Sequence, residues 1–313
     1  MISAVLISLK GDLGHVLSSS EQELITSITS GGALVGAVIA GMFADRSGRK
    51  FPLYMGCALF SLGAIIQAAA YSLAQMTVGR FAVGLGVGSA AMVIPLYIGE
   101  LAPANYRGRM IAFNNMSVTL GQLISYSLGA GFAEVTHGWR YMVALGVVPA
   151  LILAALLPMC PESPRQLLLQ GGSDEALVVL RKTYPNANEH QLSCKLNLIN
   201  NSVSEMKTAK RGNGIWRTFL QLFSDAPSRR ALICACTVMA ISQLGGFNTL
   251  MYYSATLFSL VGFSKPAAVS IVVGGTNFVF TFVNMLIIDR VGRRRILLWT
   301  VSGMVSRLPP ITC

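Results

Sequence analysis

The sequence predicts an all-α polytopic membrane protein, and two observations support this prediction. Of the 313 residues 53% are apolar and only 12% are charged, with a mean hydropathy of +0.59, whereas soluble domains carry about 25% charged residues. The apolar residues also gather in long runs that are nearly free of charge. Because a helix needs about 20 apolar residues to cross a bilayer, the chain has room for about eight or nine crossings. This composition excludes a disordered chain, a disulfide-dense secreted module and a typical cytosolic enzyme.

The apolar runs predict the individual crossings in order. The first run, Met1–Leu9, is too short to cross a membrane and is predicted to be the tail of an earlier helix, which we count as helix 1. Each of the later runs except the last has the length of a transmembrane helix. These runs are Leu24–Ala44, Phe51–Tyr71, Gln75–Ile98, Met110–Ala133, Tyr141–Met159, Ala231–Leu260, Ala267–Ile288 and the short Ile296–Val305.

The basic residues alternate between loops and so predict the orientation of the chain. The loops after helices 2, 4, 6 and 8 carry 3, 2, 10 and 4 of the 24 Lys and Arg residues, respectively. The positive-inside rule places these loops in the cytoplasm. The net charge of +11 therefore marks topology rather than a surface for nucleic acid. We expect an integral multi-pass protein of the plasma membrane.

One long hydrophilic interval, residues 161–230, divides the chain. It contains short amphipathic helical patterns, a break at Tyr184-Pro185-Asn186 and a flexible connection at Gly212-Asn213-Gly214. We therefore predict an N-terminal half at residues 1–160, a cytoplasmic linker with short helices at 161–230, and a partial C-terminal half at 231–313.

A charged motif occurs twice. Asp45-Arg46-Ser47-Gly48-Arg49-Lys50 follows helix 2, and Asp289-Arg290-Val291-Gly292-Arg293-Arg294 follows helix 8. An offset of six helices places both loops on the same side of the membrane and predicts two halves related by an axis along the membrane normal. The glycine in each motif permits a tight turn.

With these motifs the chain resembles the sugar porter family of the major facilitator superfamily. Further family motifs are Gly79-Arg80-Phe81, the run 95–103 followed by Arg107-Gly108-Arg109, and Pro161-Glu162-Ser163-Pro164-Arg165. The stretches 24–27, 63–70, 121–126 and 268–278 are most similar to the fungal, proton-coupled myo-inositol branch. The resemblance implies the superfamily fold of two six-helix halves in parallel repeat, here only from the end of helix 1 through part of helix 9.

Neutral amides inside apolar helices are the candidate substrate contacts. An amide donates and accepts hydrogen bonds without charge, which suits the hydroxyls of a sugar or polyol in a membrane cavity. Hydrogen bonding between helices is the competing interpretation of each amide. The resemblance implies substrate contacts in helices 5, 7 and 8 at Gln122, Gln243, Asn248 and Asn277, with Ser242 where the family usually has a glutamine.

Glycines shape two of the predicted helices. Gly245 and Gly246 predict a break in helix 7, because each costs about 1 kcal/mol relative to alanine, and a break would open backbone groups to a ligand. Tyr252 and Tyr253 beyond it are candidate gates, with interfacial anchoring as the alternative. Close helix packing is predicted for Gly32, Gly36, Gly84, Gly86 and Gly88.

The resemblance also implies an intracellular latch, a set of ion pairs that holds one conformer and releases as the halves rock, with topology anchoring as the alternative. Its candidates are Asp45, Arg46, Arg49, Glu100, Arg107, Glu162, Arg165, Asp289, Arg290 and Arg293. Arg80 matches the usual neighbour of a helix 1 aspartate that couples transport to protons in the family. That aspartate does not occur in this sequence.

Together these features predict a transmembrane carrier of myo-inositol that works by alternating access, with proton symport in the intact family pattern. A hexose or pentose carrier and a non-transporting nutrient sensor are the alternatives. The expected partners are a small polyol or monosaccharide, protons and the lipid bilayer; no catalytic residue, cofactor, metal site or nucleic acid is expected. Helices 10 to 12 are also missing, so we interpret the chain as truncated at both ends and do not expect it to transport alone.

Overall fold

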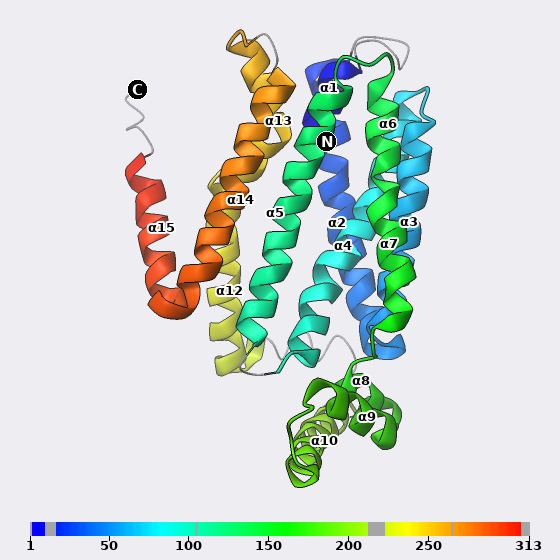
Figure 1. Ribbon diagram of the computed structural model, residues 1–313, viewed down its shortest axis with the longest axis vertical. Helices are drawn as coiled ribbons and strands as arrows, with labels where there is room; N and C mark the ends of the chain where they lie inside the picture. The colour runs from blue at the N-terminus through cyan, green and yellow to red at the C-terminus, as the bar shows by residue number, and fades with distance from the viewer. Residues whose placement is uncertain (1, 10–16, 104–105, 212–222, 264–265, 308–313) are drawn as a thin grey trace.

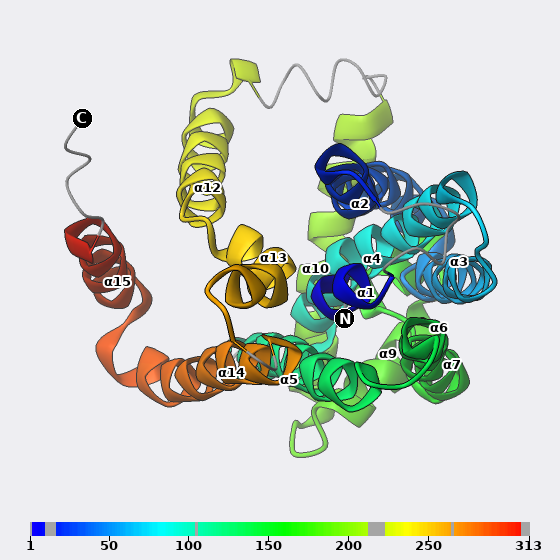
Figure 2. The same cartoon turned by 90° about the horizontal axis from the view of Figure 1, so that it is seen from above.

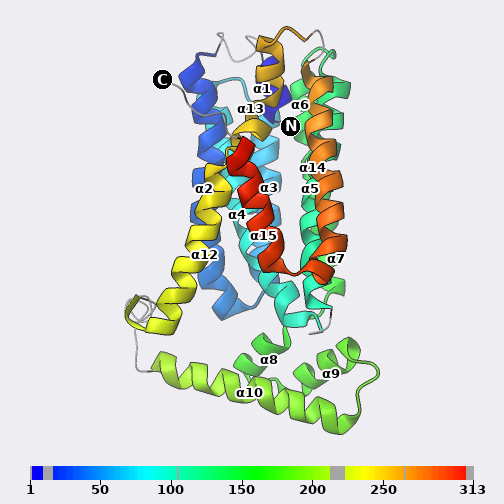
Figure 3. The same ribbon diagram turned by 90° about the vertical axis from the view of Figure 1, so that its left-hand side faces the viewer.

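The computed structural model describes residues 2–9, 17–103, 106–211, 223–263 and 266–307, and in these residues the regular structure is helical throughout. Long helices stand side by side, and the helices of the linker lie beyond one end of them, which we call the linker end (Figures 1 and 3). The α-helices are α1 Ile2–Ser8, α2 Ser19–Ser47, α3 Lys50–Ala68, α4 Leu73–Leu101, α5 Arg107–Phe132, α6 Gly138–Leu145, α7 Val147–Leu156, α8 Pro164–Gln170, α9 Ser173–Thr183, α10 Glu189–Arg211, α12 Ala226–Leu244, α13 Phe247–Leu260, α14 Pro266–Val291 and α15 Arg293–Arg307.

Six segments of the described residues are long and apolar enough to cross a membrane, in agreement with the predicted runs. They are Ser19–Ser47, Lys50–Ala68, Leu73–Leu101, Gly138–Met159, Ala226–Leu260 and Pro266–Ile288. The run predicted at Met110–Ala133 is the 26-residue helix α5, which is long enough but less apolar. The reason is that one face of α5 carries the polar residues of the cavity described below.

Several helix bounds differ from the predicted runs, and two of these differences have a local cause. α2 begins five residues before Leu24, because Ser18 and Glu21 form a capping box in which the Ser18 amide donates to Glu21 Oε2 at 2.8 Å and the Glu21 amide donates to Ser18 Oγ at 3.3 Å. The run Tyr141–Met159 is divided between α6 and α7. Pro149 lacks the N–H that would bond the carbonyl of Leu145 in a continuous helix.

The glycine predictions are confirmed. α12 ends before Gly245, and Gly246 has a φ of +70°, which separates α12 from α13. In the repeated charged motif, Gly48 after α2 has a φ of +91° and Gly292 after α14 has a φ of +88°. Both motifs therefore turn the chain with a left-handed glycine, as expected of a structural repeat.

The N-terminal part is built around α4, which packs between α2 and α3. A Cβ on Gly84 would lie 3.0 Å from Gly32 Cα, and one on Gly86 would lie 2.6 Å from the Gly56 carbonyl oxygen. In the linker, α8, α9 and α10 pack on Leu167, Leu168, Ala176, Val179 and Val203. α9 ends before Tyr184, where the break was predicted. The predicted connection at 212–214 lies outside the described residues.

Arg140 joins the end of α3 to the start of α6. Its Nη1 and Nη2 donate to the carbonyls of Ala68 and Ala70, both at 2.8 Å, and its guanidinium lies 4.5 Å from the ring centroid of Tyr71. The carbonyls at the end of α3 have no partner within the helix, so an outside cation satisfies them.

We expect Arg140→Ala to lower the free energy of unfolding by about 2 kcal/mol, because hydrogen bonds to a charged group contribute about 1.5–3 kcal/mol. Arg140→Lys keeps the charge but cannot donate with two arms. Its free energy of unfolding is therefore expected to lie between those of the unchanged protein and of Arg140→Ala. The measurement is thermal unfolding in detergent micelles. Arg230→Ala, at an exposed position of α12, is the control, and equal effects of Arg140→Ala and Arg230→Ala would contradict this assignment.

Candidate functional site

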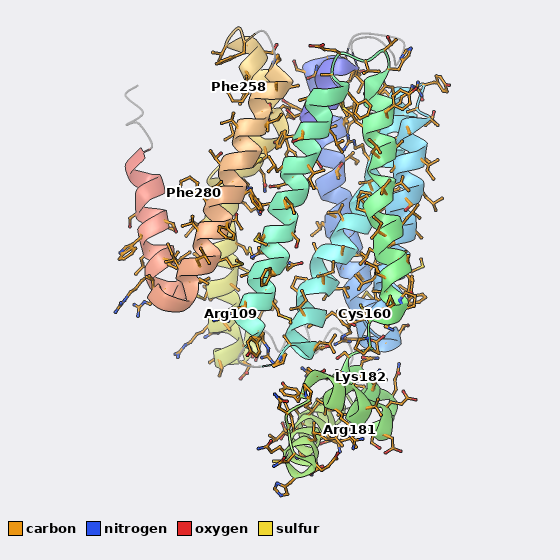
Figure 4. All side chains as sticks on the ribbon, in the orientation of Figure 1. Arg109, Cys160, Arg181, Lys182, Phe258 and Phe280 are labelled. Atoms are coloured by element: carbon orange, nitrogen blue, oxygen red, sulfur yellow. The ribbon has the colours of Figure 1, made fainter. Side chains whose placement is uncertain are left out.

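A cavity of about 830 Å³ lies between α5 of the N-terminal part and α12, α13 and α14 of the C-terminal part. Its walls run from Gln122 and Asn277 to Gly108 and Ile288. Arg109, the neighbour of Gly108, marks the linker end of α5 in Figure 4. The cavity therefore extends toward the linker end, and no charged residue belongs to the described lining.

Two polar stripes face each other across this cavity. Asn115, Thr119 and Gln122 line it from α5, and Asn277, Thr281 and Asn284 line it from α14. Both sets have the spacing i, i+4, i+7, which places three side chains on one face of a helix. α5 and α14 run in opposite directions and lie side by side (Figures 1 and 2).

Four of these lining residues, Asn115, Thr119, Thr281 and Asn284, were missed by sequence reasoning. Each is a short polar side chain, and a single residue of this kind in a helix does not by itself indicate a binding site. The signal that would have found them is the same i, i+4, i+7 polar stripe in two helices of opposite halves. This repeated spacing defines the walls of the cavity better than any single amide.

Gln122 and Asn277 meet across the two halves. Asn277 Nδ2 donates to Gln122 Oε1 at 2.9 Å, in a partly buried setting. An amide group without a hydrogen-bond partner costs free energy in an apolar surrounding, and this bond gives both side chains a partner. A ligand hydroxyl can both donate and accept, so it can replace either member of this bond.

The break between α12 and α13 presents the remaining amides. Ser242 and Gln243 line the cavity from the end of α12. Asn248, on the first turn of α13, donates from Nδ2 to Gln243 Oε1 across the break and is not itself part of the described lining. Asn248 thus orients Gln243, and a direct contact of Asn248 with substrate stays a prediction.

The two candidate gate tyrosines lie on α13 and outside the described lining of the cavity. Tyr252 is exposed and Tyr253 is half-buried. Tyr252 lies close enough to Arg80 of α4 for an electrostatic interaction. The buried Arg80 Nε has no hydrogen-bond partner among the described residues. Its role beside a proton-carrying acid stays a prediction.

Three of the latch candidates come together at the linker end. Arg49 and Glu100 form a two-armed ion pair, with Nη2 2.7 Å from Oε1 and Nε 2.9 Å from Oε2. Their side chains are only 5% and 9% exposed. Glu162 accepts hydrogen bonds from the backbone amides of Arg49 and Ser163, both at 3.0 Å. This network ties the start of α3 to the end of α4 and to the segment before α8.

Gln166 belongs to the same network and was not identified from the sequence. Its Oε1 accepts a hydrogen bond from Arg49 Nη1 at 3.0 Å, and Gln166 is buried. The sequence offered only its place in the first turn of the helix that follows Pro161-Glu162-Ser163, and the contact with Arg49 depends on how α8 packs. Gln166 therefore connects the linker helix α8 to the ion pair.

The other latch candidates are not part of the Arg49–Glu100 pair. Asp45 and Arg46 are exposed at the end of α2, Arg107 is exposed at the start of α5, and Arg165 is half-buried in α8. The side chains of Asp289, Arg290 and Arg293 lie outside the described part of the structure. The network seen lies within the N-terminal part and α8, so a latch between the halves stays a prediction.

Comparison with known proteins gives close matches over nearly the whole chain. The family model described as "Sugar (and other) transporter" matches residues 6–312. Myo-inositol transporter 1A of Cryptococcus neoformans var. grubii is 43% identical over 308 residues, which are 98% of this chain and 54% of the relative. Myo-inositol transporter 2 of Schizosaccharomyces pombe is 43% identical over 309 residues, which are 98% of this chain and 56% of the relative. The chain thus spans about half the length of these curated relatives.

Among solved structures, the chain is similar to the major facilitator superfamily proton:xylose symporter XylE bound to 6-bromo-6-deoxy-D-glucose. The match has a TM-score of 0.78 at 27% identity and covers 93% of this chain and 66% of that one. The predicted fold, a partial major facilitator fold, is confirmed by this likeness.

Proposed function

The chain belongs to the sugar transporter family, a family of integral membrane carriers rather than enzymes, and we propose that it acts in the transport of myo-inositol by alternating access. The observation that carries this proposal is the cavity between the two halves, whose described lining holds no charged residue, with the Gln122–Asn277 pair across it. The names of the relatives, myo-inositol transporters at 43% identity, support the same substrate.

The cavity chemistry suits a neutral polyol. Each hydroxyl of myo-inositol needs a partner once it leaves water, and amide and hydroxyl side chains of the two stripes supply donors and acceptors without charge. A charged substrate such as a sugar phosphate would be left without a counter-charge in this lining. Substrate binding would replace the Gln122–Asn277 bond by bonds from both halves to the same ligand.

The direction of opening follows from the basic loops. We propose that the linker end faces the cytoplasm, because the loops at that end hold most of the Lys and Arg residues. The cavity reaches toward that end, which under this proposal makes the conformer one that faces the cytoplasm. The plasma membrane as location and protons as coupling ion, with Arg80 in the coupling site, are part of the same proposal.

Equilibrium binding tests the substrate. We expect the purified chain in lipid nanodiscs to bind tritiated myo-inositol saturably, with unlabelled myo-inositol displacing it at least about tenfold better than D-glucose or D-xylose. Asn277→Ala is expected to raise Kd about tenfold, because it removes hydrogen bonds that contribute about 1.4 kcal/mol to binding. Thr276→Ala is the matched control, since its exposed hydroxyl donates to the Val272 carbonyl of its own helix at 2.8 Å.

The outcomes separate the alternatives. Saturable binding of glucose or xylose that myo-inositol does not displace would support the monosaccharide carrier instead. No saturable binding of any of the three would overturn a substrate site in this chain. Whether inositol or a monosaccharide binds better, we expect Ser242→Gln to change the ratio of inositol affinity to glucose affinity. This substitution restores the glutamine that is usual in the family.

A further inference from the structure

Tyr126 lies directly beyond the substrate amides, on the side away from the linker. It stands four residues after Gln122 on the same face of α5, and it is 7% exposed. Its ring packs against Gly274 of α14, three residues before Asn277, where an added Cβ would lie 2.8 Å from Tyr126 Cδ2. The ring therefore fills the contact between α5 and α14 next to the Gln122–Asn277 pair, on the side away from the linker.

The Tyr126 hydroxyl begins a buried chain of hydrogen bonds. It donates to the backbone carbonyl of Met251 on α13 and accepts from the Ser254 hydroxyl at 3.5 Å. Ser254 Oγ lies 3.3 Å from Ser3 Oγ, and Ser3 Oγ accepts from the amide of Ala255 at 2.8 Å. If Ser3 donates to Ser254, each of the three hydroxyls donates one hydrogen bond and accepts one.

This chain of bonds connects the two halves. α1 and α5 belong to the N-terminal part, and α13 and α14 belong to the C-terminal part, with α1 and α13 together at the end opposite the linker (Figure 1). Ser3 and Ser254 are 1% and 0% exposed. The contact between α1 and α13 at the end opposite the linker is therefore closed in the same structure in which the cavity extends toward the linker end.

We propose that Tyr126 and the bonds it makes to Met251 and Ser254, continued to Ser3, form the seal that closes the cavity on the side opposite the linker. Tyr126 is a positioning residue in this proposal, which rests on the proposed function. A polar seal suits a contact that opens repeatedly, because each hydroxyl and carbonyl can bond to water once the halves separate. An interface of apolar side chains would instead expose apolar surface on opening.

Thiol labelling tests the seal without any substrate. Met251→Cys keeps the backbone carbonyl that accepts from Tyr126, removes the Met251 Sδ that lies 3.2 Å from the Tyr126 hydroxyl, and places a reporter thiol at a buried position. The reagent is a charged methanethiosulfonate, and peptide mass spectrometry separates the reporter from the native cysteines. Tyr126→Phe, which removes only the hydroxyl, is expected to raise the labelling rate at Met251→Cys about tenfold, equivalent to about 1.4 kcal/mol.

Two comparisons make the test specific. Ser127→Ala is the matched control, since Ser127 is exposed on the same helix and its hydroxyl donates to the Leu123 carbonyl at 3.1 Å; it should leave the rate unchanged. Asn284→Cys reports on the cavity wall nearer the linker end, where Tyr126→Phe should not raise labelling. A rise at both reporters would mean general loosening, and no rise at Met251→Cys would mean that Tyr126 does not hold the seal; either result overturns the proposal. Failure of inositol binding in the nanodisc assay would count against the proposed function and leave these rates untouched.

Discussion

Gly88→Val is expected to destabilise the folded protein by about 3 kcal/mol or more. A Cβ at Gly88 of α4 would lie 2.0 Å from the carbonyl oxygen of Ala33 and 2.8 Å from its Cα. These are backbone atoms of α2, so no side-chain rotation relieves the clash. Overpacking typically costs about 1–3 kcal/mol. Here the helices themselves must move apart, so we expect the free energy of unfolding to fall by at least the upper value of that range. That is a large part of a total stability of about 5–15 kcal/mol.

The measurement is the monodisperse fraction after detergent extraction, together with the apparent Tm. Gly99, on the same helix, is the matched control, because an added Cβ there meets no atom within 4 Å. Gly99→Ala is expected to be neutral or to stabilise by up to about 1 kcal/mol, since alanine is the better helix former. Equal Tm values for Gly88→Ala and Gly99→Ala would show that the contact between α2 and α4 is looser than described.

Glu100→Ala is expected to destabilise the protein by about 3–5 kcal/mol. The change leaves the Arg49 guanidinium buried at the linker end without its carboxylate, and an uncompensated buried charge costs this much. Thermal unfolding of the purified chain measures the effect. The double change Arg49→Met with Glu100→Leu should recover part of the loss, because it removes both charges.

The chain contains its own control for this prediction. Arg181 and Glu189 form an ion pair of the same residue types in the linker, with side chains 61% and 69% exposed. Glu189→Ala is expected to change stability by less than about 1 kcal/mol, since water screens exposed charges. Similar losses from Glu100→Ala and Glu189→Ala would contradict the structural importance of the buried pair.

Local features of the sequence predicted the helices well. Hydropathy located the membrane-spanning segments, Gly246 predicted the break between α12 and α13, and Gly48 and Gly292 predicted the repeated turn. These features act within one or two helical turns, so they can be read from neighbours in the chain. The start of α2 was missed because its capping box at Ser18 lies in a polar stretch outside the apolar run.

The candidate site was predictable only as residue types. Gln122, Ser242, Gln243 and Asn277 were identified as polar groups within apolar helices, and all four line the cavity. Asn248 was identified too; it bonds to Gln243 and is not part of the described lining, so its contact with substrate stays a prediction. The sequence contained no means of separating these two situations, because both satisfy the same need of a buried amide for a partner.

By itself, then, the sequence determined the membrane class, the order and ends of most helices, the repeat and the chemical type of the cavity. The tertiary structure decided which polar groups meet: Gln122 with Asn277, Arg49 with Glu100 and Gln166, and Tyr126 with Met251. The first and last of these pairs are separated by 155 and 125 residues. Helix formation depends on near neighbours, whereas the partner of a buried polar group depends on which helix faces pack together. That choice brought Tyr126 beside Gly274 and Ser254, and with it the seal opposite the linker end.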